Sequence, residues 1–369
     1  MPIWAFNFNG TPPRGDIPTY FVATSRHAVG FPPAASAVVD TVGAGAFFVP
    51  PSGCTLYGWD SRATAKPVWT WTLADCDASL LYDEYRNLDV SDDGTTVAFS
   101  AFIPDASGQG STPSLHVFNA QTGAVLYASD EKVAGAGAGT VSTSKNGAFV
   151  TWSTANGLAV FSPRGVVRDM VKAAGPNEIS DSGVYVASCT ENAASVFAWD
   201  GAHYALNLSL APPASPVSST WFCVDVAMSS DGSGKEAGEL ITFAWISGDV
   251  LTARVTTYSM VTGKLTTDWL SATNAKLQTN PTVRMDDGYI GVALWGDSDD
   301  TPTAVVLKSG SDKPVFGYTT PGSMFGVDIL VDHAQSTPTS DALYFSVAGK
   351  ATPCVCGRAR KGRAVFSHP

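Results

Sequence analysis

An acidic residue recurs along this chain at one place of a repeated pattern, directly before a β-branched or apolar residue. Its acidic members are Asp40, Asp89, Glu178, Asp225 and Asp328, and Thr140 and Thr282 hold the same place in two further copies. Carboxylates gathered in space suit a hard cation, because Ca²⁺ takes about six to eight oxygen ligands. Each carboxylate can equally accept hydrogen bonds from backbone amides of a neighbouring element and so tie two elements together. The pattern predicts either a Ca²⁺ site or a set of structural hydrogen bonds.

A second group of polar residues stands at the start of the same segments. It comprises Arg86, Asn87, Asn177, Asn280 and Arg284. Brought together, these side chains could line a ligand-binding pocket; a solvated rim of loops is the alternative interpretation. The five histidines are scattered along the chain, and no Ser-His-Asp or metal-ligand spacing joins them. The sequence therefore contains no catalytic constellation.

The elements that position these residues form a repeat of four short apolar strands. Its clearest copy contains a strand at 88–91, the turn Asp92-Asp93-Gly94, strands at 97–100 and 115–118, the turn Thr122-Gly123, and a strand at 125–127. The first turn recurs and closes on Gly147, Gly183, Gly232 and Gly288. Asp-Gly and Asn-Gly supply the positive φ angles that short hairpins require. Each copy is therefore expected to form one antiparallel sheet.

Seven copies of this repeat fit the chain, with no helical periodicity between them, which excludes alternating strands and helices. A closed radial array is the natural arrangement, because closure removes exposed sheet edges. We therefore predict an all-β chain, residues 1–369 forming a single seven-bladed β-propeller of four-stranded antiparallel blades. Eight blades are the alternative, because residues 20–23 and 28–31 could be strands of a further unit. Within residues 1–36, strand 4–8 is expected to latch the last blade, and the rest is an irregular Pro-rich segment.

The whole chain resembles the WD40, YVTN and quinoprotein-like group of propellers. Trp59-Asp60 and Trp199-Asp200 fall at the ends of third strands, where WD40 repeats place their Trp-Asp pair, although the accompanying Gly-His is missing. Ser91-Asp92-Asp93-Gly94 is similar to the Asp box of sialidase propellers but lacks one residue between Asp and Gly. The resemblance implies first strands that border a central channel, with ligands bound at the channel face.

Charge and cysteine content limit the partners and the compartment. The net charge of -11 argues against nucleic acid, and no apolar run is long enough for a membrane-spanning helix. Among six cysteines, Cys54 could pair with Cys76 inside one unit and Cys189 with Cys223 between neighbouring units. Asn9 and Asn207 begin Asn-x-Ser/Thr sequons for glycosylation. These features favour an extracellular or cell-surface protein; a cytoplasmic protein with reduced cysteines is the alternative.

The sequence predicts a non-catalytic binding or structural propeller that engages a protein or glycan through its channel face or rim. No cofactor is required by any motif, apart from the Ca²⁺ that the acidic positions would suit. An enzyme of the quinoprotein-like, hydrolase or lyase type, with carboxylates and arginines at the channel mouth, is the alternative.

Overall fold

The structure is a computed structural model. It describes residues 20–24, 42–48, 54–60, 69–73 and most of 88–367. The gaps in the last range are 92, 105–110, 131–138, 155, 181, 191–192, 212–213, 215–216, 219, 230–238, 274–279, 296–301, 320–323, 338–339, 350–351 and 361–362.

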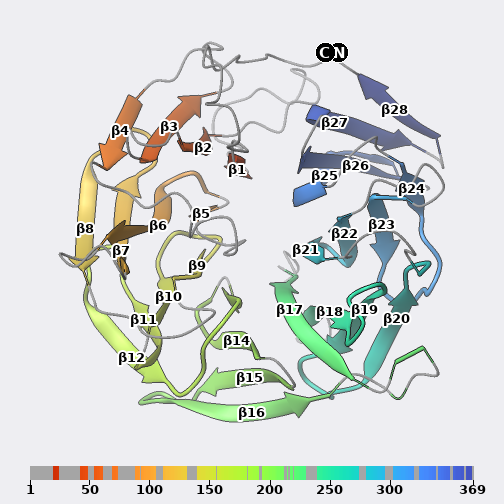
Figure 1. Ribbon diagram of the computed structural model, residues 1–369, viewed down its shortest axis with the longest axis horizontal. Coiled ribbons are helices and arrows are strands. Elements are labelled where there is room, and N and C mark those ends of the chain that lie inside the picture. Colours follow the sequence, from red (N-terminus) through yellow and green to blue (C-terminus); the bar gives the residue numbers. More distant parts are fainter. Residues whose placement is uncertain are drawn as a thin grey trace. The chain divides into compact units, whose positions relative to one another are not determined.

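The described residues form seven four-stranded sheets, in each of which the strands follow one another in chain order (Figure 1). The first sheet contains β1 (Tyr20–Thr24), β2 (Val42–Phe48), β3 (Cys54–Asp60) and β4 (Trp69–Leu73). The second contains β5 (Leu88–Val90), β6 (Thr96–Pro104), β7 (Ser111–Asn119) and β8 (Val125–Asp130). The third contains β9 (Val141–Thr143), β10 (Val150–Thr154), β11 (Gly157–Phe161) and β12 (Val167–Val171).

The remaining sheets repeat the same order. The fourth contains β13 (Asn177–Ile179), β14 (Tyr185–Thr190), β15 (Ala193–Trp199) and β16 (Tyr204–Leu210). The fifth contains β17 (Trp221–Met228), β18 (Leu240–Ser247), β19 (Ala253–Ser259) and β20 (Leu265–Leu270). The sixth contains β21 (Pro281–Asp286), β22 (Tyr289–Leu294), β23 (Ala304–Lys308) and β24 (Phe316–Tyr318). The seventh contains β25 (Met324–Thr337), β26 (Ser340–Gly349), β27 (Thr352–Arg360) and β28 (Arg363–Ser367).

The repeat predicted from the sequence is confirmed, with a correction in its first copy. Residues 20–24, which could have belonged to an eighth unit, instead form β1 and pair antiparallel with β2. Trp59-Asp60 and Trp199 end third strands, as expected. The predicted latch at residues 4–8 lies outside the described residues. Within the described part of the chain, no helix has the length and apolar character needed to cross a membrane.

Glycine turns join the first and second strands, as the repeat predicted. Gly94, Gly147 and Gly183 have φ angles of 67°, 64° and 65°, a region that side chains with a Cβ atom rarely adopt. The amide of Gly147 donates to the Ser144 carbonyl (2.8 Å), and Ser144 Oγ accepts a hydrogen bond from the amide of Phe149 (2.9 Å). Gly288 also has a positive φ, whereas Gly232 lies outside the described residues.

A β-bulge recurs in the outer strands. The pairing of the third with the fourth strand skips one outer-strand residue in the second, third, fourth and fifth sheets, at Leu126, Arg168, Asn207 and Thr266. Such an extra residue bends the strand and strengthens its twist.

The described residues fall into two compact units. The N-terminal unit ends at Val184 and the C-terminal unit begins at Tyr185. In each unit the core lies between consecutive sheets. In the N-terminal unit, Phe99 and Phe118 pack against Trp69 and Trp71 of the preceding sheet. In the C-terminal unit, Phe243 and Trp245 share a cluster with Val196 of the preceding sheet.

Candidate functional site

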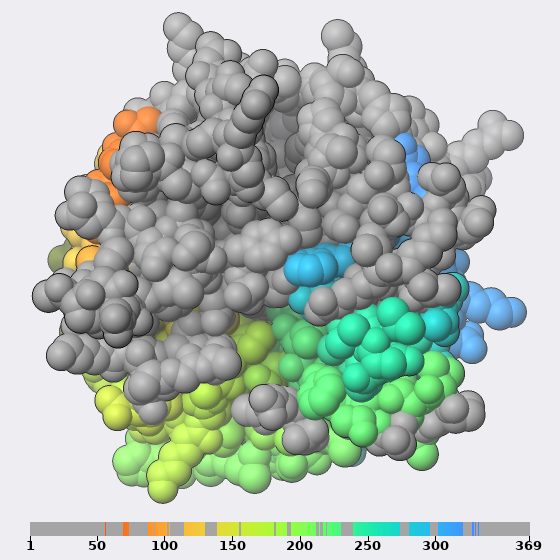
Figure 2. All heavy atoms as spheres, in the orientation of Figure 1, coloured from red at the N-terminus to blue at the C-terminus, as the bar shows by residue number. Residues whose placement is uncertain are grey.

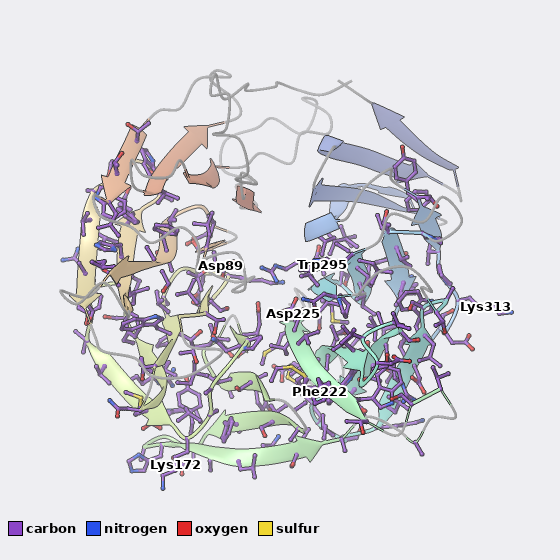
Figure 3. All side chains as sticks on the ribbon, in the orientation of Figure 1. Asp89, Lys172, Phe222, Asp225, Trp295 and Lys313 are labelled. Carbon is purple, nitrogen blue, oxygen red and sulfur yellow. A yellow bond between two sulfur atoms is a disulfide. The ribbon has the colours of Figure 1, made fainter. Side chains whose placement is uncertain are left out.

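Asp89 joins two sheets of the N-terminal unit. Asp89, labelled in Figure 3, lies at the centre of β5, and its neighbours Leu88 and Val90 are buried in the core. Asp89 Oδ2 accepts hydrogen bonds from the backbone amide of Thr143 (2.6 Å) and from Thr143 Oγ1 (2.9 Å). Thr143 ends β9, the first strand of the next sheet. The carboxylate therefore ties one sheet to the next, as one interpretation of the acidic pattern expected.

Asp225 makes the same kind of connection in the C-terminal unit. It belongs to β17, next to a register shift between Cys223 and Asp225, and is 1% exposed. Asp225, labelled in Figure 3, accepts through its Oδ2 a hydrogen bond from the backbone amide of Val283 (2.8 Å) in β21, the first strand of the following sheet. A carboxylate buried this deeply is stabilised only where donors face it. The amide of Val283 is such a donor.

Asp286 provides a third connection, which the sequence analysis missed. It ends β21, is 1% exposed, and its Oδ2 accepts the backbone amide of Val331 in β25 (2.6 Å). Sequence reasoning assigned this residue to the turn that closes on Gly288. The signal that could have revealed it is its place in the strand, two positions from Arg284 and four from Thr282, which puts all three on one face.

The other acidic positions give less information. Glu178 lies at the centre of β13 and is half-buried. Asp328 lies in β25, opposite Ser346, but its side chain is outside the described part of the structure. Asp40 also lies outside the described residues, so its place in the acidic pattern stays a prediction. Among the described residues, no group of three or more His, Cys, Asp or Glu side chains could hold a metal ion.

Asn177 is a structural residue in the N-terminal unit rather than part of an open pocket. It is completely buried, and its Oδ1 accepts a hydrogen bond from Thr151 Oγ1 (2.5 Å). Its Nδ2 donates to Thr140 Oγ1 (2.9 Å) and to the Gly175 carbonyl (3.2 Å). The amide thus connects β13 with β10 and with the residue that precedes β9. A ligand could reach Asn177 only by displacing these bonds.

Asn280 and Arg284 are the other members of the expected pocket that the structure describes. Asn280 directly precedes β21 and is 8% exposed; its Oδ1 is buried and has no hydrogen-bond partner in the described part of the chain. Arg284 is half-buried in β21, and its Nη1 donates to the Val283 carbonyl (3.1 Å). Arg86 and Asn87 lie outside the described residues. The structure therefore leaves the predicted pocket untested as a whole.

A disulfide joins Cys189 of β14 to Cys223 of β17, with a Cα–Cα distance of 5.5 Å. Both residues are buried in the core between the fourth and fifth sheets. This confirms the predicted cross-link between neighbouring units. Cys76 lies outside the described residues, as does the side chain of Cys54, so the second predicted pair stays a prediction.

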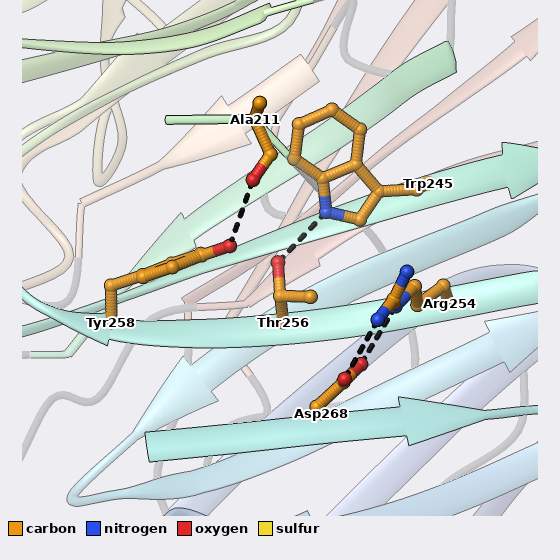
Figure 4. A network of polar contacts seen from close by, with 6 residues as sticks. All are labelled: Ala211, Trp245, Arg254, Thr256, Tyr258 and Asp268. Carbon is orange, nitrogen blue, oxygen red and sulfur yellow. Dashed lines mark hydrogen bonds and ion pairs between the residues drawn. The ribbon is translucent and has the colours of Figure 1, made fainter. Parts of the chain in front are cut away.

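A buried polar network in the fifth sheet had no counterpart in the sequence analysis (Figure 4). Arg254 of β19 is 2% exposed and forms a bidentate ion pair with Asp268 of β20, with Nε–Oδ1 and Nη2–Oδ2 distances of 2.7 Å. Its guanidinium carbon lies 5.4 Å from the ring centroid of Trp221. Nearby, Trp245 Nε1 donates to Thr256 Oγ1 (2.8 Å). No sequence signal marked this pair, because Asp268 lies opposite Thr256 and reaches Arg254 only diagonally across the two strands.

The surroundings of Tyr258 and Asp200 shift the pKa of each side chain. Burial raises the pKa of the Tyr258 hydroxyl, which donates to the Ala211 carbonyl (3.2 Å), above its ordinary value of 10.0 (Figure 4). Backbone amides of His203 and Ala202 hold the pKa of Asp200 below its ordinary value of 3.8. Asp200 is thus part of a turn, in which its Oδ1 accepts both amides (2.8 Å each).

Comparisons with known proteins identify the fold. No family model matches the sequence, and no curated protein matches it. Hsv2 of Kluyveromyces marxianus has a TM-score of 0.53 at 11% identity, over 88% of this chain and 93% of its own. A Bacteroides fragilis protein provisionally described as a 6-phosphogluconolactonase has a TM-score of 0.54 at 13% identity, over 97% of this chain and 95% of its own. These structures are β-propellers, and with the seven repeated sheets they show that the chain has the β-propeller fold.

Proposed function

We propose that this chain is a non-catalytic β-propeller that acts in an extracellular or cell-surface setting and binds a protein or glycan partner through its channel face or rim. One observation carries the proposal: two of the carboxylates that the sequence nominated for chemistry, those of Asp89 and Asp225, hold consecutive sheets together, and Asp286 does the same. Asp225 and Asp286 are each 1% exposed and bonded to an amide of the next sheet. A general acid or base must reach the proton that it transfers, and groups buried in this way do not.

The disulfide supports the setting. Disulfides form and persist in oxidising compartments and are rare in the cytosol. Cys189 and Cys223 are 1% and 6% exposed, so the bond is shielded from reducing agents in the folded protein. A rigid scaffold of cross-linked sheets is well suited to present loops to a partner.

Two assays in parallel test the proposal. The first measures saturable binding of the purified chain to an immobilised glycan panel and to extracellular proteins. The second measures hydrolysis of 6-phosphogluconolactone, the substrate class named for the Bacteroides structures. We expect binding to at least one ligand, retained in Asp225→Asn, and no acceleration of lactone hydrolysis. Turnover that is lost in Asp225→Asn would contradict the proposal.

The compartment has its own test. A count of free thiols in denaturant without reductant is expected to fall at least two short of the six cysteines. Six free thiols in protein made in an oxidising compartment would contradict the extracellular setting.

A further inference from the structure

Within the described part of the chain, the outer edge of the fourth sheet is unpaired and its strand carries no charged side chain, although it contains a bulge. β16 (Tyr204–Leu210) pairs with β15 on one side only, and its seven residues include no charge. The outer strands β8, β12, β20 and β28 all contain charged residues, and the uncharged β4 and β24 have five and three residues. Leu206 is 59% exposed. A long, uncharged, apolar edge is a template for unwanted strand pairing, which proteins normally block with charges or with a covering group.

The bulge residue of β16 differs from its counterparts. In three outer strands the skipped residue is half-buried: Leu126, Arg168 and Thr266. Arg168 lies 4.6 Å from the centroid of the Phe149 ring and donates to the Gly183 carbonyl, and Thr266 Oγ1 donates to the Thr257 carbonyl (3.1 Å). Asn207 is exposed, and the described part of the structure contains no hydrogen bond to its amide. The side-chain amide is therefore open to solvent.

Asn207 also begins the sequon Asn207-Leu208-Ser209. Leu208 is half-buried against the core between the fourth and fifth sheets, whereas Ser209 is exposed like Asn207. The bulge thus places both polar members of the sequon at the surface and anchors the strand through the residue between them. In Figure 1, β16 is the outermost strand of its sheet. In Figure 2, green atoms, the colour of the chain around β16, lie at the surface.

We propose that Asn207 is an N-glycosylation site and that its glycan covers the uncharged edge of β16. The inference rests on the extracellular setting proposed above. In the transfer, the bond between the first sugar carbon and the diphosphate of a lipid-linked oligosaccharide breaks and a bond from that carbon to Asn207 Nδ2 forms. The amide loses one proton, and the lipid diphosphate departs as the leaving group. A hydrated glycan at this point excludes a second strand from the edge that Leu206 exposes.

The experiment directs the full chain into the secretory pathway of cultured mammalian cells and examines the disulfide-bonded fraction from cells and medium together. The peptide that contains Asn207 is analysed by mass spectrometry before and after peptide N-glycosidase, which leaves aspartate at a formerly glycosylated asparagine. Three chains are compared: wild type, Ser209→Thr, which keeps the sequon, and Ser209→Ala, which removes it and leaves Asn207 in place.

We expect glycan on Asn207 in wild type and Ser209→Thr, and its complete loss in Ser209→Ala. An unmodified Asn207 in disulfide-bonded wild-type protein would overturn the glycan proposal while leaving the proposed function intact. Free thiols at Cys189 and Cys223 would instead contradict the extracellular setting.

A second measurement tests the covering role itself. On heating, Ser209→Ala is expected to aggregate faster than wild type, and Ser209→Ala with Leu206→Lys to recover, because a charge on the edge replaces the glycan. Equal aggregation of all variants would overturn the covering role. A stable dimer of Ser209→Ala that Leu206→Lys dissociates, with no glycan in wild type, would assign the edge to a second copy of the chain.

Discussion

The replacement of Asp225 by alanine tests the structural role of the acidic residues quantitatively. Asp225 is 1% exposed and its Oδ2 lies 2.8 Å from the Val283 amide. A hydrogen bond to a charged group contributes about 1.5–3 kcal/mol, and alanine leaves the buried Val283 amide without this acceptor. We expect Asp225→Ala to lower the free energy of unfolding by about 2–4 kcal/mol. Asp225→Asn keeps a neutral acceptor, so its loss should be smaller, about 1 kcal/mol.

The assay is urea unfolding followed by tryptophan fluorescence, with Trp221, Trp245 and Trp269 as reporters in the same unit. Asp312→Ala is the matched control, because Asp312 is an exposed aspartate and should change stability by less than about 0.5 kcal/mol. All chains are measured with EDTA and with millimolar Ca²⁺. A ligand that binds only the folded state would stabilise wild type in proportion to the logarithm of its concentration. The reasoning is refuted if Asp225→Ala matches Asp312→Ala, or if its defect appears only when Ca²⁺ is present.

Four further predictions concern other parts of the structure. Cys189→Ser with Cys223→Ser should lower the free energy of unfolding by about 3–4 kcal/mol, the loop-entropy value for a separation of 34 residues; an unchanged urea midpoint would contradict this. Asp268→Ala should lower the free energy of unfolding by about 2–4 kcal/mol, because it leaves Arg254 buried without its ion-pair partner. The double variant Arg254→Met with Asp268→Ala should recover most of this loss. Equal losses in the single and the double variant would show that the two residues are not energetically coupled. The free energy of unfolding should fall above pH 10, because the raised pKa of Tyr258 means that the folded state binds the hydroxyl proton more tightly than the unfolded state does. Tyr258→Phe should make this fall with pH less steep, as measured by unfolding curves at several pH values. Asn280→Leu should raise the free energy of unfolding by about 1–2 kcal/mol, because it removes the buried Asn280 Oδ1, an acceptor without a partner in the described structure. A lower melting temperature of this variant would show that Asn280 Oδ1 has a donor.

The repeat and its turns could be predicted because their signals are local. Positive φ at Gly94, Gly147 and Gly183 follows from the short polar turns that these residues close. The disulfide could be predicted because Cys189 and Cys223 fall in consecutive units. The first strand of the first sheet was harder to assign, because a long connection separates β1 from β2 and obscured the repeat.

The interactions that depend on register could not be predicted. Arg254 and Asp268 are 14 residues apart, and only the pairing of β19 with β20 shows that they meet. The bulge positions share no residue type that a sequence could reveal, because Leu, Arg, Asn and Thr occupy the skipped positions. Asn177 was expected to line a pocket or a solvated rim of loops, yet it is fully buried, and partners on β10 and at Thr140 satisfy its amide. Polarity alone does not show where a side chain lies once its hydrogen bonds can be satisfied inside the fold.

Amide hydrogen exchange tests the central claim most directly, because the claim assigns one backbone amide to each carboxylate. Asp89 accepts a hydrogen bond from the amide of Thr143, Asp225 from the amide of Val283 and Asp286 from the amide of Val331. Exchange at these three amides is measured in wild type, Asp89→Ala, Asp225→Ala and Asp286→Ala, with and without Ca²⁺. We predict that each substitution accelerates exchange at its own amide most strongly and that Ca²⁺ changes none of the rates. Uniform acceleration in every variant, or protection of all three amides by Ca²⁺ in wild type, would contradict the account.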